Sequence, residues 1–261
     1  MRWVSVIISV LIVSSSFGQD TSLFKREVFV KGKDSLNYRM LYPIKYDVDK
    51  KYPIVLFLHG AGERGSDNAK QLLHGSALFL DSMNRLKYPA FVVFPQCPQN
   101  GFWANIKRNL EGEADSLGNF AFNSAGGASN SLNLAMQLID SLSKTPQAKE
   151  DQIYVGGLSM GGMGTFEILW RKPQFFAAAF AICGGGDPQK VALYAKGFPI
   201  WVFHGGADNV VPVSNSRLMS NTLRQAGAKV KYTEYPGVGH NSWNKAFAEP
   251  DFLEWLFAQE R

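Results

Sequence analysis

The sequence predicts an α/β fold in which a mostly parallel β-sheet carries helices on both faces. Two observations support this prediction: short apolar runs recur along the chain, and stretches with helical spacing lie between them. Strands that alternate with helices form parallel sheets, and strands buried on both faces read as continuous apolar runs. The hydrophobic share of 46% is ordinary for a globular protein and excludes wholesale disorder.

Eight segments are expected to form the strands of this sheet. The first two flank Gly32-Lys33-Asp34 and read as an opening hairpin, and the others are short and apolar or β-branched. In chain order they are Phe24–Val30, Leu36–Tyr42, Pro53–Leu58, Ala90–Phe94, Ile153–Val155, Ala177–Ile182, Ile200–Phe203 and Val230–Tyr235.

Apolar residues at helical spacing predict four helices between and after these strands. One stripe runs from Leu132 to Ile139, and a second runs from Met163 to Trp170, where Lys172-Pro173 stops it. A third helix covers Arg217–Ala226 and ends at Gly227, which suits a C-cap. A closing helix contains Phe252–Phe257.

One segment breaks the alternation of strands and helices. Gln99 to Asn130 is rich in Gly, Asn, Ser and Ala and has few apolar residues. Loops of this length inside a compact domain are usually functional or mobile. The chain has no internal repeat, and residues 19–261 are expected to form a single domain.

Residues 1–18 read as a signal peptide. Arg2 precedes an apolar run from Trp3 to Val13 that is too short to span a bilayer, and Ser16 and Gly18 give the small-x-small pattern of a cleavage site. A buried N-terminal strand is the alternative. We therefore expect a secreted or periplasmic protein, and no later segment is long and apolar enough for a membrane span.

Charge and composition exclude several classes of function. The 27 basic residues exceed the 22 acidic residues by five, and they are scattered, so nucleic acid is not an expected partner. Two cysteines exclude a disulfide-dense scaffold, and the four histidines lack metal-ligand spacing. With no phosphate loop or dinucleotide fingerprint either, we expect neither a metal nor a cofactor.

The segment Gly157-Leu158-Ser159-Met160-Gly161 matches the pattern G-x-S-x-G. A predicted strand precedes it and a predicted helix follows it, which is the context of a nucleophile elbow. The sharp turn exposes the Ser159 hydroxyl, and small residues are needed two positions before and after it. A purely structural glycine turn is the alternative.

A serine nucleophile needs a base, and an acid that orients this base. After a nucleophile elbow the acid and then the histidine are expected to follow the serine along the chain, and Asp208 and His240 are the pair that fits this order. His204 is expected to be a structural histidine at a strand end. A pairing of Asp187 with His204 remains the second possibility.

Backbone amides must meet the negative charge that develops on oxygen during acyl transfer. Met160, directly after the serine, supplies one amide, and Ala61 in the loop after the third strand is assigned the other, with Gly60 or Gly62 as alternatives. Glu63 and Arg64 are expected to hold this loop through ion pairs, with direct substrate contact as the alternative.

On these motifs the chain resembles the α/β-hydrolases. It looks most like the secreted esterases and predicted peptidases related to carbohydrate esterase family one and polyhydroxybutyrate depolymerases. The matching segments are His59-Gly60-Ala61-Gly62-Glu63-Arg64-Gly65, Pro95-Gln96-Cys97-Pro98, Gly157-Leu158-Ser159-Met160-Gly161-Gly162, Cys183-Gly184-Gly185-Gly186-Asp187, His204-Gly205 with Asp208, and Gly239-His240 with Trp243.

The resemblance implies an α/β-hydrolase fold with eight strands in the spatial order 1-2-4-3-5-6-7-8. Two strands then separate Cys97 from Cys183, by about 14 Å, so both thiols are expected to be free and largely buried. Asp187 to Phe198 leaves room for one short helix but not for a lid domain. Trp103 and Trp243 are candidates for stacking on a sugar or an aromatic acyl group.

The leading hypothesis is a secreted serine esterase that cleaves acetyl or feruloyl esters on plant polysaccharide. The alternatives are a serine peptidase of the prolyl-oligopeptidase-like type, a polyhydroxybutyrate depolymerase, and a carbohydrate-binding module on an inactive hydrolase fold. The expected partner is a small or polymeric ester, and the sequence does not specify the oligomeric state.

Overall fold

The computed structural model describes residues 20–108 and 120–261. The predicted signal peptide, residues 1–18, lies outside the described residues, as does the stretch 109–119 of the long loop. Within the two described ranges, no helix is both long and apolar enough to cross a membrane.

All eight expected strands are present and form one sheet. Their bounds are β1 Phe24–Lys31, β2 Asp34–Leu41, β3 Tyr52–Leu58, β4 Phe91–Pro95, β7 Ala148–Leu158, β8 Ala178–Ile182, β9 Pro199–Gly205 and β10 Lys229–Tyr235. The spatial order β1-β2-β4-β3-β7-β8-β9-β10 is the order that the resemblance implied. The pairings β1–β2 and β2–β4 are antiparallel and the remaining ones are parallel.

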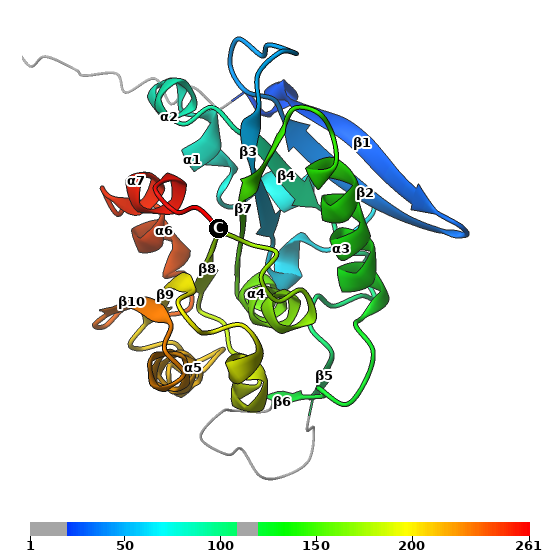
Figure 1. The fold of residues 1–261 in the computed structure, drawn as a ribbon. Helices are drawn as coiled ribbons and strands as arrows, with labels where there is room; N and C mark the ends of the chain where they lie inside the picture. The colour runs from blue at the N-terminus through cyan, green and yellow to red at the C-terminus, as the bar shows by residue number, and fades with distance from the viewer. Residues whose placement is uncertain (1–19, 109–119) are drawn as a thin grey trace, which may run out of the picture.

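Helices cover both faces of this sheet, with α3 and α4 on one side and α6 and α7 on the other (Figure 1). The helices are α1 Ser76–Leu80, α2 Ser82–Lys87, α3 Asn130–Ser143, α4 Met160–Arg171, α5 Ser214–Gln225, α6 Trp243–Ala246 and α7 Phe252–Phe257. Four short 3₁₀ segments are described: η1 Thr21–Leu23, η2 Ala61–Glu63, η3 Lys70–Leu72 and η4 Pro188–Leu193. Gly227 follows α5 with a φ of +85°, as expected of a C-cap.

The core lies in two layers, one on each face of the sheet. Along β3, Ile54, Leu56 and Leu58 pack into the layer beneath α3 and α4, whereas Val55 and Phe57 pack into the layer with α1, α6 and α7. Successive side chains of a strand point to opposite faces, so an unbroken apolar run serves both layers. This explains why the strands read as continuous apolar segments.

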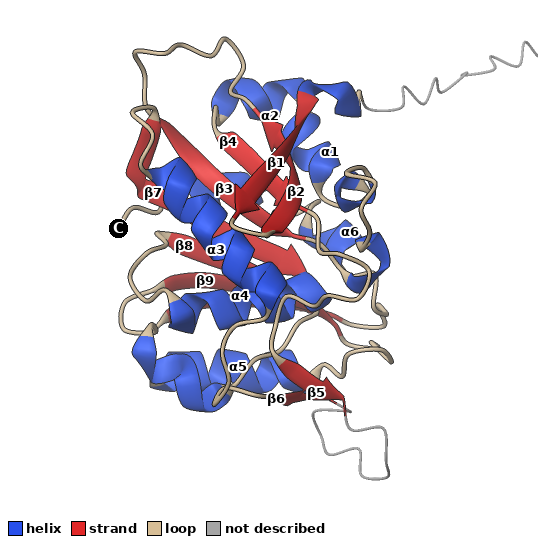
Figure 2. Cartoon of the chain, turned by 90° about the vertical axis from the view of Figure 1, so that its right-hand side faces the viewer, coloured by secondary structure: helices blue, strands red, loops and turns tan. Residues whose placement is uncertain are grey.

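The loop Gln99–Asn130 holds structure that the sequence pattern did not predict. Two short strands, β5 (Ile106–Arg108) and β6 (Phe120–Phe122), pair antiparallel as a separate two-stranded sheet. Figure 2 shows this ribbon apart from the main sheet. Three residues on each side are too few to give a readable alternation, which explains why the segment reads as a loop.

Candidate active site

The candidate site lies where the parallel strands end at their carboxyl edge. Ser159 follows β7, Asp208 follows β9, His240 follows β10, and the loop with Ala61 follows β3. Ligand sites of open α/β sheets occupy this edge, because the loops that leave neighbouring strands meet there. The topology thereby assembles residues that lie up to 179 positions apart in the sequence, from Ala61 to His240.

Ser159 occupies a strained turn between β7 and α4. Its φ of 52° and ψ of −116° lie outside the regions that side chains prefer, and its amide donates to the Ile182 carbonyl at 2.8 Å. A β-carbon on Gly157 would lie 2.5 Å from the Leu58 carbonyl oxygen, and one on Gly161 would collide with that same oxygen. Glycine is therefore required at both positions for the turn to close against β3.

Ser159, His240 and Asp208 form one hydrogen-bonded chain. His240 Nε2 lies 2.9 Å from Ser159 Oγ, and His240 Nδ1 lies 2.7 Å from Asp208 Oδ2. The Asp208 side chain is fully buried, and the amides of Val210 and Val211 donate to its Oδ1 at 2.9 Å each. Burial alone would raise the pKa of Asp208, but the contact with His204 and the hydrogen bonds from His240 and the two amides together hold it well below its usual range.

His204 does not pair with Asp187. It is fully buried at the end of β9, where it contacts Ser216 Oγ at 2.7 Å and the Val211 carbonyl at 2.9 Å. Asp187 instead caps η4 by accepting from the Gln189 amide at 2.8 Å. The alternative acid–base pair is thus not formed. His204 is hydrogen-bonded at a strand end, as expected, and its Nε2 also lies 3.2 Å from Asp208.

Ala61 and Met160 both line the pocket beside Ser159. Met160 is the first residue of α4, so its amide has no acceptor within the helix, and Ala61 opens η2. The Arg64 guanidinium holds this loop by donating to the carbonyls of Ala61 (2.9 Å) and Gly101 (3.3 Å). Arg64 therefore acts through backbone carbonyls and not through the expected ion pair with a carboxylate.

Glu63 is buried in the wall of the same pocket. Its Oε1 lies 3.8 Å from His74 Nε2, so His74 is its ion-pair partner when protonated. Burial raises the pKa of Glu63. Its Oε2 lies against the backbone of Gly60 and has no hydrogen-bond partner among the described residues.

The expectation that Trp103 stacks on the substrate is wrong. Its exposed fraction is 0%, and its Nε1–H donates to the His59 carbonyl at 3.0 Å. The His59 ring lies 5.3 Å from the indole, donates from Nδ1 to the Gly60 carbonyl (2.6 Å) and accepts the Cys97 amide at Nε2 (2.9 Å). Trp103 thus supports the strand end that carries the Ala61 loop.

Trp243, in contrast, lies in the wall of the pocket. The pocket has a volume of about 320 Å³. Its apolar lining comes from Phe102, Phe120, Leu158, Met160, Met163, Val210, Val211 and Trp243. The Phe and Val residues of this wall were not predicted from the sequence. The one signal for them was Val210-Val211, an apolar pair directly behind the acid in a loop, where Val210 is 56% exposed.

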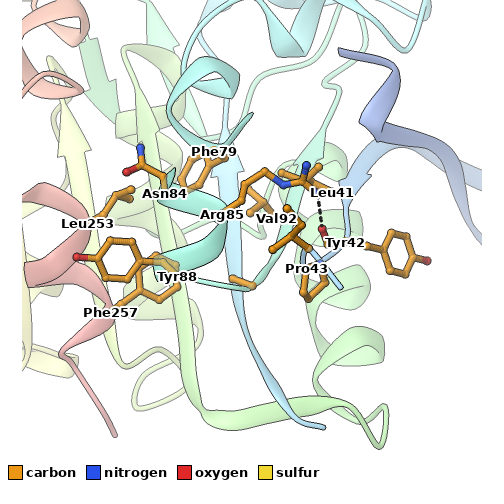
Figure 3. Close-up of a pocket in the computed structure, with 12 residues that line it drawn as sticks. Leu41, Tyr42, Pro43, Phe79, Asn84, Arg85, Tyr88, Val92, Leu253 and Phe257 are labelled. Carbon is orange, nitrogen blue, oxygen red and sulfur yellow. Dashed lines mark hydrogen bonds between the residues drawn. The ribbon is translucent and has the colours of Figure 1, made fainter. Parts of the chain in front are cut away.

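No lid domain covers the site between β8 and β9, where the connection forms only η4 in the described structure. The expected short segment is therefore confirmed. At the opposite edge of the sheet, Figure 3 shows a second hollow, with Arg85 donating to the Tyr42 carbonyl at 3.2 Å. Its volume of about 10 Å³ holds about one water molecule, so it does not suit a substrate.

Both cysteines are free and buried, as expected. The thiol of Cys183 lies next to Asp208 and His240, and the ligand atoms of these three residues lie within 4.8 Å of one another. Burial and the neighbouring Asp208 carboxylate raise the pKa of Cys183, which disfavours the thiolate that a metal needs. Asp208 and His240 already bind each other, so this donor set suits a metal poorly.

Several known proteins are similar to this chain in sequence and in fold. A solved thermostable esterase is 36% identical to this chain and superimposes on it with a TM-score of 0.81. The match covers 92% of this chain and 64% of the esterase chain. An acyl-protein thioesterase 1 from Neurospora crassa is 27% identical over 72% of this chain and 80% of its own length. An uncharacterized secreted protein from Arthroderma benhamiae is 25% identical over 80% of this chain but only 23% of its own length.

The chain thus spans about a quarter of that secreted relative and about two thirds of the thermostable esterase. Solved ferulic acid esterases and a dipeptidyl peptidase 4, at 14–19% identity and TM-scores of 0.59–0.62, share the fold alone. The profile of the phospholipase/carboxylesterase family matches residues 43–254, which is most of the sequence. The chain belongs to the phospholipase/carboxylesterase family of α/β-hydrolases.

Proposed function

We propose that this protein is a serine esterase that cleaves carboxylic esters through a covalent acyl-enzyme. The observation that carries the proposal is the hydrogen-bonded chain from Ser159 through His240 to Asp208, which ends in an apolar pocket. Membership of a family of carboxylic ester hydrolases supports the reaction class.

In this mechanism Ser159 Oγ attacks the ester carbonyl carbon while its proton passes to His240 Nε2. The bond from carbonyl carbon to alcohol oxygen then breaks, and His240 returns the proton to the leaving alcohol. Water then attacks the acyl carbon and gives a proton to His240. The bond between the acyl carbon and Ser159 Oγ breaks, His240 returns the proton to Oγ, and the carboxylic acid leaves. Asp208, buried and ionised, stabilises the imidazolium form of His240 in both halves of the reaction.

The amides of Met160 and Ala61 are assigned to the developing oxyanion. Both residues line the pocket next to Ser159, and α4 directs its amino-terminal end toward the same place. A helix N-terminus favours negative charge, and preorganised amides are worth about 3 kcal/mol each in acyl transfer. Arg64 supports this assignment because it fixes the Ala61 carbonyl.

For the substrate we propose acetyl or feruloyl esters on plant polysaccharide. Phe102, Phe120 and Trp243 give the pocket an aromatic wall that suits an aromatic acyl group, and its volume accommodates a group of that size. The short β8–β9 connection leaves room for a bulky alcohol. Because residues 1–18 are expected to be a signal peptide, we propose that the reaction takes place outside the cytoplasm, and a distant relative named as secreted is consistent with that proposal.

The test begins with a fluorophosphonate, followed by mass spectrometry of the labelled protein. The proposal expects a single adduct on Ser159, and Ser159→Ala should lose both the adduct and nearly all turnover of a short p-nitrophenyl ester. Ser141→Ala, an exposed serine on α3, is the matched control and should keep both. Unchanged turnover in Ser159→Ala would contradict the mechanism.

The substrate class is tested on acetylated and feruloylated xylan, an aminoacyl anilide and polyhydroxybutyrate in parallel. Release of acetate or ferulate supports the polysaccharide esterase. Turnover of the anilide alone would favour a peptidase, and clearing of polyhydroxybutyrate alone would favour a polyester depolymerase.

A further inference from the structure

A second imidazole, that of His204, also contacts the Asp208 carboxylate. His204 Nε2 lies 3.2 Å from Asp208 Oδ2, the same oxygen that accepts from His240 Nδ1 at 2.7 Å. The His204 and Asp208 side chains are both fully buried. The carboxylate is therefore held between two imidazoles, of which only His240 faces Ser159.

The neighbours of His204 fix which ring nitrogen carries a proton. Its Nε2 lies 2.9 Å from the Val211 carbonyl oxygen, which can only accept, so Nε2 must donate. Its Nδ1 lies 2.7 Å from Ser216 Oγ, a hydroxyl that can donate or accept. Whether His204 is neutral or charged, its Nε2 bears a proton, which it donates to the Val211 carbonyl while Asp208 Oδ2 lies close by at 3.2 Å.

The contacts of His204 also tie the acid to the body of the fold. Ser216 lies on α5, and its hydroxyl reaches the Gly184 carbonyl at 3.1 Å, just after β8. His204 itself ends β9. The loop that carries Asp208 is thus anchored through one ring to a helix and to two strands, which restricts where the carboxylate can lie.

We infer that His204 is a positioning residue, which holds the Asp208 carboxylate in line with His240 and withdraws part of its charge through the close contact of its Nε2–H with Oδ2. The inference rests on the proposed function, because Asp208 matters to catalysis only if His240 is the base. The two histidines differ in which ring nitrogen must carry a proton. His204 is protonated on Nε2, whereas His240 must be protonated on Nδ1 so that its bare Nε2 can accept from Ser159.

Other ionisable groups near His204 are already engaged. Glu234 lies opposite His204 in the β9–β10 pairing, and both of its oxygens bind the Arg217 guanidinium, while the Tyr232 hydroxyl donates to it at 2.6 Å. Cys183 ends the neighbouring strand with its pKa raised by burial. The charge that responds to loss of the His204 proton donor is therefore that of Asp208.

The test compares His204→Gln with His204→Asn in the full chain. The longer Gln amide can occupy the place of Nε2 and donate to Asp208, whereas the shorter Asn amide reaches only the place of Nδ1 beside Ser216. We expect His204→Gln to stay near wild type. His204→Asn should lose about tenfold in kcat with little change in KM. The acid side of the pH–kcat profile of His204→Asn should also move to higher pH. Without the N–H of His204 beside it, the Asp208 carboxylate keeps more negative charge, and His240 then binds its proton more tightly.

Equal kcat and equal pH profiles in the two variants would overturn the inference, since a purely structural role predicts no such difference. Nitrogen-15 NMR of the unmutated chain gives an independent readout. A proton on Nε2 of His204 supports the inference, and a proton on Nδ1 alone overturns it.

If the wild-type chain turns over no ester, the proposed function fails. The variants are then compared by proton NMR, through the low-field signal of the proton that His240 Nδ1 donates to Asp208. A signal kept in His204→Gln and lost or displaced in His204→Asn supports positioning, and an identical signal in both overturns it.

Discussion

The indole ring of Trp243 lies 5.5 Å from the imidazole ring of His240 and stands nearly perpendicular to it, at 86°. The same indole lies 5.0 Å from the ring of His74. Edge-to-face contacts of this kind stabilise a ring pair by about 1 kcal/mol beyond the area they bury. Trp243 therefore restricts the movement of His240 and also forms part of the pocket wall.

Replacing Trp243 by Ala should weaken the handling of esters with an aromatic acyl group. We expect kcat/KM for a feruloyl ester to fall about tenfold, because the wall loses apolar area and an aromatic face. The loss should be smaller for an acetyl ester, which contacts less of the wall. Trp243→Phe keeps an aromatic ring and is the control. Equal losses of kcat/KM on both esters would mean that Trp243 acts only by restricting His240 and does not contact the acyl group.

Trp103 should behave in the opposite way, because it is buried and donates to the His59 carbonyl at 3.0 Å. Trp103→Phe removes the donor and leaves a buried carbonyl without that partner, at a cost of about 1–3 kcal/mol in the free energy of unfolding. Urea denaturation measures this loss. The KM for both esters should stay unchanged in the folded variant, and a raised KM would restore Trp103 as a substrate contact.

Gly161→Ala should prevent the turn at Ser159 from closing. The added β-carbon would collide with the Leu58 carbonyl oxygen, and rigid backbone on both sides cannot move away cheaply. We expect a loss of several kcal/mol in the free energy of unfolding, or insoluble protein. Gly127→Ala is the matched control, since an added methyl there meets no atom within 4 Å. Similar melting temperatures for both variants would contradict the steric argument.

The sequence pattern predicted the main sheet because each strand is buried on both faces and reads as an apolar run. It also placed Ser159, Asp208 and His240 at strand ends, where the topology brings them together. This part depends on local patterns and on chain order, both of which one sequence contains. The short helices α1, α2 and α6 were not predicted, since segments of four to six residues seldom show a clear helical period. Of the short helices, α7 was predicted because its six residues are mostly large and apolar.

The burial of Trp103 could not be predicted from the local sequence pattern. It follows a strand end and lies in a loop rich in small residues, as a substrate-contacting tryptophan would. Its burial depends on Gly164 of α4 being small enough for the indole to pack against the helix, since a β-carbon there would lie 2.5 Å from the Trp103 side chain. Contacts between segments some sixty residues apart leave no local signature.

The two cysteine thiols should not react with thiol reagents in the folded protein. Cys97 and Cys183 are both buried, and burial raises the pKa of Cys97 to about 11, so little thiolate exists near neutral pH. We expect a chromogenic disulfide reagent to titrate two thiols after denaturation and almost none before it. Rapid reaction of one thiol in the folded protein would show that its surroundings open on the timescale of the assay.

His59 should make the fold sensitive to acid. Burial lowers the pKa of His59 from 6.5 to about 4, while its Nδ1–H donates to the Gly60 carbonyl and its bare Nε2 accepts from the Cys97 amide. In the unfolded chain this imidazole takes up its proton near pH 6.5, whereas in the folded chain it resists protonation until about pH 4. The unfolded state therefore binds more protons between these two values, and the free energy of unfolding falls as the pH is lowered through that window.

The size of this effect is roughly 3 kcal/mol at most, because each pKa unit corresponds to about 1.4 kcal/mol. Urea denaturation between pH 4 and pH 7 measures it. His59→Gln can still accept the Cys97 amide through its side-chain oxygen but cannot take up a proton, so its free energy of unfolding should depend less steeply on pH. All other titrating groups are shared by the two proteins, and the difference in slope therefore isolates His59. Parallel curves would mean that the buried imidazole is not what limits stability in acid.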